Sequence, residues 1–138
     1  MRRSLSATTL FVNEHQHIVM MLPPEEDVAD RTPVWDALQD LFMDTESEDS
    51  YGFIARRCAD SKYALEDLER ILFNEVFPAL SFNLLSIAGE WRGFQTDWLV
   101  ARILKKHKFG KRAPWVLRSY VKDAWSEIEP QISALRDV

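Results

Sequence analysis

Cysteine and long apolar stretches are scarce in this sequence. Cys58 is the single cysteine among 138 residues, so it cannot form a disulfide within the chain. Nothing therefore calls for an oxidising compartment. Apolar runs such as residues 18–22 are far shorter than the roughly 20 residues that a membrane span requires. The basic start Met-Arg-Arg leads into polar residues, unlike a signal peptide. We therefore expect a cytoplasmic protein without a membrane span.

Glycine and proline are also few, at 4 and 6 residues. Their scarcity excludes a collagen-like repeat and argues against a low-complexity or disordered chain. Hydrophobic residues make up 46% of the sequence and charged residues 28%. A chain of this length and composition can bury one core, and it is too short for two domains of ordinary size. The sequence thus predicts a single globular domain.

The N-terminal segment has a different pattern from the rest of the chain. Residues 8–12 and 17–22 are rich in β-prone side chains and flank a polar stretch, as in a β-hairpin. Two prolines and three acidic residues follow, and such a stretch marks a break between elements. We divide the chain into an N-terminal arm, residues 1–28, and a helical domain, residues 29–138.

Apolar residues at helical spacing predict helices after this arm. Thr32 can cap a helix whose first residue is Pro33. A short helix is expected at 51–59. An amphipathic helix is expected over 65–76, and Pro78 ends or kinks it.

The segment after Pro78 is apolar on nearly every side, which is typical of a central buried helix. A further helix is expected at 97–107, ended by Gly110. The last helix starts at Pro114, and Pro130 breaks it before a short tail helix. The predicted fold class is mainly α, a single-domain bundle of five or six helices, to which the N-terminal arm adds a candidate β-hairpin.

Charge is distributed unevenly along the chain, whose net charge is −5. Residues 25–75 hold fifteen acidic and five basic residues, a net charge of −10. Residues 91–125 hold nine basic and two acidic residues, a net charge of +7. Such asymmetry steers association with charged partners and says little about the fold.

The acidic half contains a polar stretch rich in carboxylates. It does not match a calcium-binding loop, because Asp49 stands where the sharp turn needs glycine and Ala55 stands where a bidentate glutamate belongs. The carboxylates either imitate a polyanion that plugs a basic site on a partner or form a solvated acidic face. The candidate partner-binding residues are Asp44, Glu46, Glu48 and Asp49, with Asp36, Asp40 and residues 66–69 as acidic neighbours.

An aromatic turn is the most distinctive local feature. Trp91, Phe94 and Trp98 surround two glycines. Amphipathic aromatic side chains on a turn can anchor a partner, and they can equally lock two helices together in the core. Glu90 and Trp91 complete the candidate partner-binding set.

The basic segment, residues 105–112, can contact phosphates, because phosphate neutralisation dominates affinity for nucleic acids. Its alternative role is to complement the dipole at a helix C-terminus. The overall acidity disfavours a dedicated nucleic-acid binder. The candidate nucleic-acid-binding residues are Lys105, Lys106, Lys111 and Arg112, joined by Arg102, Arg118 and Lys122.

No residue set has the spacing of a known catalytic or metal site. His15 and His17 share one face of a strand, but nothing completes a metal site around them. Cys58 with His107 and an aspartate elsewhere is formally a nucleophile set, but a lone cysteine on a helix is better explained as a small core residue. Asp97 is explained as a charge at a helix N-terminus. We therefore predict no metal, no cofactor and no enzymatic activity.

Three motifs resemble those of a family of small bacterial helical proteins of uncharacterised function. The resemblance covers about residues 30–105, and Gln39 and Met43 stand where the first family motif carries serine and leucine. Members of the family look like small acidic immunity proteins that neutralise toxins. The motifs are Trp35-x-x-Leu38-x-x-Leu41-Phe42-Met43-Asp44-Thr45, Leu68-x-x-Ile71-Leu72-x-x-Glu75-Val76-x-Pro78, and Asn83 followed by Ala88-Gly89-Glu90-Trp91-x-x-Phe94-x-x-x-Trp98-Leu99.

Small size, the acidic half and this resemblance together predict a non-enzymatic binding protein. The resemblance implies an immunity protein that binds a cognate bacterial toxin effector and occludes it. The alternative is a nucleic-acid-associated regulatory protein that uses residues 105–112. The sequence leaves a homo-oligomer open.

Overall fold

The chain folds as a helical bundle, and the computed structural model describes residues 21–43, 50–85, 93–110 and 115–137. Within these ranges no residue lies in a β-strand, and the predicted mainly α class with a single helical domain is confirmed. The candidate hairpin of the arm lies outside the described residues. In chain order the elements are η2 (Pro24–Glu26), α1 (Val28–Leu38), η3 (Gln39–Phe42), α2 (Ser50–Ala59), α3 (Leu65–Ile71), η4 (Leu72–Val76), α4 (Phe77–Leu84), α5 (Thr96–Phe109), η5 (Trp115–Leu117) and α6 (Arg118–Arg136).

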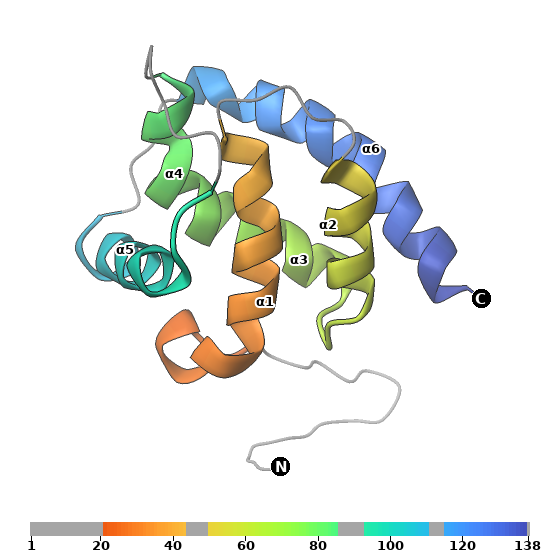
Figure 1. Cartoon of the computed structure of the whole chain (residues 1–138), viewed down its shortest axis with the longest axis horizontal. Helices are drawn as coiled ribbons and strands as arrows, with labels where there is room; N and C mark the ends of the chain where they lie inside the picture. Colours follow the sequence, from red (N-terminus) through yellow and green to blue (C-terminus); the bar gives the residue numbers. More distant parts are fainter. Residues whose placement is uncertain (1–20, 44–49, 86–92, 111–114, 138) are drawn as a thin grey trace.

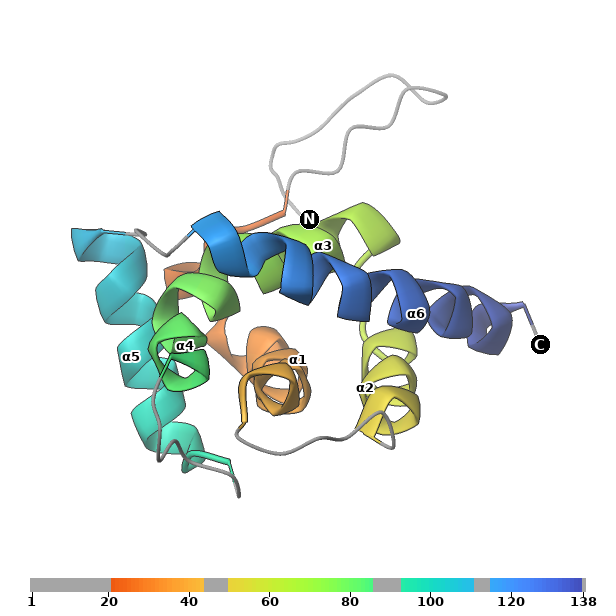
Figure 2. The same ribbon diagram turned by 90° about the horizontal axis from the view of Figure 1, so that it is seen from above.

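Helix α1 is the central element. Helices α2 and α5 pack on its two sides, and the continuous segment α3–η4–α4 crosses behind it (Figure 1). The long helix α6 packs along α2, as the view from above also shows (Figure 2). No helix among the described residues is long and apolar enough to cross a membrane.

The core lies where α1 meets the other helices. Its largest side chains come from helices far apart in sequence, so closing it requires the whole bundle. Cys58 is fully buried in this core, as its interpretation as a core residue requires, and burial raises its thiol pKa to about 12. The largest fully buried apolar side chains are Trp35, Phe42, Leu38, Ile54, Leu68, Ile71, Leu72, Leu80, Leu99, Ile103 and Ile128.

A buried ionic network crosses the core at the beginning of α1. Arg31 is 0% exposed, and its guanidinium donates to both carboxylate oxygens of Glu75 at 3.0 and 2.8 Å. The Trp35 indole N–H donates to the same carboxylate at 2.9 Å. Arg31 also donates to Asp27, one turn earlier, at 2.6 Å. These bonds pair each buried charge with an opposite one, which offsets the large cost of removing it from water.

Asp27 extends this network to the segment before α3. It accepts hydrogen bonds from the Tyr63 hydroxyl at 2.5 Å and from Lys62 Nζ at 3.0 Å. Lys62 also reaches the exposed carboxylate of Asp30 at 2.9 Å. Burial alone pushes the Asp27 pKa upward, but the bonds from Tyr63, Lys62 and Arg31 outweigh it and lower this pKa.

The first helix begins earlier than the sequence predicts. Helix α1 begins at Val28, not at Pro33, and Pro33 lies inside it. Thr32 is not a cap, because its hydroxyl donates to the carbonyl of Val28 at 2.6 Å. Pro33 is exposed, so its ring points away from the core, while the bonds between Asp27 and Arg31 stabilise the preceding turn.

Of the two effects predicted for Pro78, ending or kinking the helix, the structure excludes the first. The chain stays helical from α3 into α4, and the five-residue π-helical segment η4 precedes the proline. There the N–H of Phe77 donates to the carbonyl of Leu72, five residues earlier. Pro78 lies directly after this wide turn, where the chain returns to α-helical bonding, so its missing N–H removes one bond without ending the helix. The same wide turn carries Glu75 into the buried network.

Helix α4 is not buried on every side as its composition predicts. Phe82 is 41% exposed, and Leu85 just after the helix is 59% exposed. The physical reason is that α4 lies at an edge of the bundle, where α5 covers only part of it (Figure 1). The apolar excess of this segment therefore forms surface as well as core.

The C-terminal helix also departs from the prediction. Helix α6 runs unbroken through Pro130, so there is no separate tail helix. Pro130 has no N–H, so the carbonyl of Ser126, four residues earlier, lacks its helical partner. Both residues are exposed, so water can bond to that carbonyl. Near the end of α6, Arg136 donates to carbonyls at the C-terminal end of α2, including those of Cys58 and Ala59. The expected helix at 97–107 is confirmed as α5, and Gly110 ends it with φ of 149°.

We predict that Arg31→Met lowers the free energy of unfolding by about 3–5 kcal/mol, because Glu75 and Asp27 lose their buried partner. Arg70→Met is the matched control, since the Arg70–Asp67 pair is exposed and is worth about 0–1 kcal/mol. Adding Glu75→Gln to Arg31→Met restores part of the loss. Urea unfolding measures all three, and equal losses for Arg31→Met and Arg70→Met would contradict the network's role.

Acid should unfold the protein partly through Asp27. Its pKa in the folded state lies below the ordinary 3.8, so its stabilising contribution is complete above that value and is lost as the pH falls through the folded pKa. We predict that Asp27→Asn is less stable at neutral pH but loses less stability between about pH 5 and about pH 2. Thermal midpoints across this range measure it, and parallel pH profiles for the two chains would refute the assignment.

Candidate functional site

An aromatic cluster is exposed where α4 meets α5. The rings of Phe94 and Trp98 stack with centroids 4.5 Å apart. The Phe82 ring contacts both, and its centroid lies 6.1 Å from that of Phe94 and 6.5 Å from that of Trp98. Phe82 is 41% exposed and Trp98 is 43% exposed. We call these three residues with Arg102 the aromatic surface.

Arg102 joins this surface from the next turn of α5. Its Nε donates to the carbonyl of Ala79 at 3.0 Å, and its guanidinium lies 5.1 Å from the centroid of the Phe82 ring. The first contact ties α5 to α4, and the second holds a positive charge against an aromatic face. Trp98 and Arg102 are four residues apart on one helix, so they lie on the same face of α5.

Gln39 anchors the segment that precedes α5 in the chain. Its side-chain oxygen accepts the Phe94 N–H at 2.7 Å, and its amide nitrogen donates to the Phe94 carbonyl at 3.4 Å. Gly93 adopts a φ of 102°, which favours glycine, and a Cβ there would meet Gln39 at 3.5 Å. Gln39 is 4% exposed, so a buried amide fixes the position of Phe94.

Two carboxylates lie close to Gln39 along the chain, and we call Asp36 and Asp40 the acidic border. Asp36 is exposed and accepts a hydrogen bond from Gln39 at 2.9 Å, so it lies beside the side chain that holds Phe94. Partial burial, and secondarily the charge of Asp36, raise the Asp40 pKa. The charged form of Asp40 therefore costs free energy in the protein alone.

The structure brings together only some of the residues that the sequence analysis proposed. Phe94 and Trp98 of the aromatic turn meet, and they both bridge two helices and remain partly open to solvent. Phe82 was not proposed, because it lies outside the turn and only the α4–α5 packing brings it there. Six partner-binding candidates lie outside the described residues, namely Asp44, Glu46, Glu48, Asp49, Glu90 and Trp91.

The nucleic-acid candidates are divided in the same way. Lys105 and Lys106 lie in the C-terminal half of α5, whereas Lys111 and Arg112 lie outside the described residues. His107 pairs with Glu25 at 2.6 Å, which accounts for its position without catalysis. Within the described part of the chain, no group of three or more His, Cys, Asp or Glu side chains is placed to hold a metal ion.

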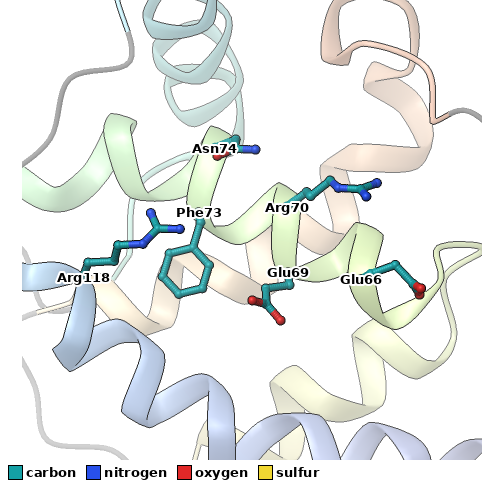
Figure 3. A pocket seen from close by; sticks show the side chains of 6 residues that line it. All are labelled: Glu66, Glu69, Arg70, Phe73, Asn74 and Arg118. Atoms are coloured by element: carbon teal, nitrogen blue, oxygen red, sulfur yellow. The ribbon is translucent and has the colours of Figure 1, made fainter. Parts of the chain in front are cut away.

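A shallow hollow of 240 Å³ lies between α3, η4 and the start of α6 (Figure 3). The Arg118 guanidinium lies 4.4 Å from the centroid of the ring of Phe73, which also lines the hollow. Its walls carry both acidic and basic side chains, so its charge favours neither an anionic nor a cationic ligand. The lining residues are Glu66, Glu69, Arg70, Phe73, Asn74 and Arg118.

Residues 29–131 match the model of a family described as a domain of unknown function, DUF7079. The chain belongs to the DUF7079 family. This agrees with the resemblance to a family of uncharacterised function. No curated protein and no solved structure matches the chain. The DUF7079 match includes the aromatic surface and its acidic border.

We predict that Gln39→Ala lowers the free energy of unfolding by about 1–3 kcal/mol, because it leaves the partly buried Phe94 backbone groups without their partner. Gln131→Ala is the control: Gln131 is exposed on α6, and its loss should change stability by less than about 0.5 kcal/mol. Urea unfolding provides the values, and near-ultraviolet circular dichroism reports the loss of the Phe94–Trp98 stack. Equal effects of the two changes would contradict the role of Gln39 in holding Phe94.

Proposed function

We propose that this protein is a non-enzymatic binding protein whose aromatic surface docks on a protein partner. In its specific form, the proposal is an immunity protein that neutralises a cognate bacterial toxin effector by direct binding and occlusion. The observation that carries it is the cluster of Phe82, Phe94 and Trp98, in which Phe82 and Trp98 are exposed and which Gln39 and Arg102 hold in place.

The chemistry of this surface supports a protein partner. Tryptophan and arginine dominate the energetics of protein interfaces, especially near the centre of a buried patch. Phe82 and Trp98 together expose large apolar area, and a partner that covers them gains free energy from its burial. Because Gln39 and Arg102 fix the surface beforehand, little conformational entropy is lost on docking.

The acidic border supports a partner with basic groups. Asp40 carries a charge that its surroundings disfavour, and a basic group on a partner would relieve this cost. In the sequence, Asp44, Glu46, Glu48 and Asp49 follow soon after it, and we propose them as the residues of first electrostatic contact. Glu90 and Trp91, shortly before Phe94 in the chain, complete the proposed interface.

A growth assay tests this function. Genes beside the one that encodes this protein are expressed singly in a bacterial host, and any that arrests growth is then expressed with it. We expect one such gene product to be toxic alone, to be neutralised by this chain and to bind it in a stoichiometric complex that survives nuclease. If no neighbouring product is toxic, or if the toxic one does not bind the purified chain, the immunity proposal fails.

Variants of the surface locate the interface. We predict that Phe82→Ala and Trp98→Ala each raise the Kd for the toxin by about 30-fold or more, the effect of a residue at the centre of an interface. Phe53→Ala is the control, because Phe53 is a comparably exposed aromatic, at 45%, on α2. Isothermal titration calorimetry measures the Kd values. Equal affinities for Phe53→Ala and Trp98→Ala would place the interface elsewhere.

Asp40→Asn distinguishes a binding role from a structural one. Removing a charge with a raised pKa should increase the free energy of unfolding at neutral pH. The same change should slow association with a basic partner, since border charges act mainly on the association rate. A gain in stability with unchanged association would exclude Asp40 from the interface.

A further inference from the structure

A second exposed surface lies at the other end of α5 and differs in chemistry from the aromatic surface. The exposed fraction of the residue is 74% at Phe109, 80% at Trp115 and 56% at Tyr120. Lys105 and Lys108 are exposed on the last turns of α5. We call these five residues the basic corner.

The chain limits how far apart the two halves of this corner can lie. Gly110 and Trp115 are five residues apart, so their Cα atoms are separated by at most about 18 Å. The end of α5 and the beginning of α6 lie toward the same corner of the molecule in Figure 2. Further along, Lys122 is exposed two residues after Tyr120. Within the described residues, Lys105, Lys108 and Lys122 form no ion pair, so their charges face solvent.

We propose that the basic corner binds single-stranded nucleic acid, with the lysines against phosphates and the aromatic rings against bases. Such sites combine a basic surface that follows the backbone with aromatic side chains on which bases stack. Three highly exposed rings among uncompensated lysines provide both components. The charge complementarity is local, since the chain as a whole has a net charge of −5.

The same features favour nucleic acid over an anionic membrane. The Lys108 Nζ lies 5.4 Å from the centroid of the Phe109 ring, so a cation already lies against one face of this ring. Stacking with a base on the open face of the ring leaves that lysine hydrated and close to a phosphate. The exposed large apolar side chains here are mainly aromatic, and Val116 is the aliphatic exception.

Fluorescence anisotropy of the full chain with a labelled oligothymidylate of about 16 nucleotides tests the proposal. We expect binding at about 50 mM salt that weakens by at least tenfold at about 200 mM salt. Lys105→Glu with Lys108→Glu should weaken binding by at least tenfold. Arg56→Glu with Arg57→Glu is the matched control on α2, because it changes the net charge equally and leaves the corner intact.

The aromatic component has its own control. Phe109→Ala with Trp115→Ala should weaken oligonucleotide binding by at least tenfold, whereas Phe53→Ala on α2 should leave it unchanged. The inference is overturned if the oligonucleotide does not bind, or if the two charge variants lose affinity equally. It is also overturned if the chain binds phosphatidylserine vesicles and not the oligonucleotide. Toxin neutralisation by the Phe109 and Trp115 variant should be normal, so this inference and the proposed function can fail separately.

Discussion

The arrangement of the bundle depends on one buried cation. Arg31 bonds to Glu75 in η4 and to Asp27 before α1, and Asp27 in turn bonds to Tyr63 before α3. The segments that contain Tyr63 and Glu75 are thereby fixed to the beginning of α1 around one guanidinium. A buried charge without its partners is strongly unfavourable, so alternative packings of these helices are penalised. The core supplies most of the stabilising free energy, and the network selects the register in which it closes.

This register determines which apolar side chains reach the surface. Because η4 is held against α1, α4 continues to the edge of the bundle, where Phe82 faces both α5 and solvent. Gln39, directly after α1, then holds Phe94 against α5, and Trp98 stacks on it. The aromatic surface is thus a consequence of how α1 is anchored.

Helical periodicity is a local property, so the sequence predicts most helices and the burial of Cys58 correctly. The sequence wrongly predicts that a helix starts at Pro33 and breaks at Pro130, whereas both prolines lie inside helices. An exposed helix face tolerates a proline that helix propensity alone disfavours. The partners of Arg31 are up to 44 residues away, and nothing in the local pattern identifies them. Trp98 was proposed from its aromatic turn, but its contact with Phe82 depends on tertiary packing.

The central claim is that the protein presents a surface fixed before any partner arrives. Hydrogen exchange of the Phe94 amide in the free protein tests it most directly, because this N–H donates to the buried Gln39 side chain rather than to a helix. We predict that this amide exchanges as slowly as amides in the middle of α1, through large-scale unfolding. Exchange at the rate of an exposed loop would contradict a preformed aromatic surface.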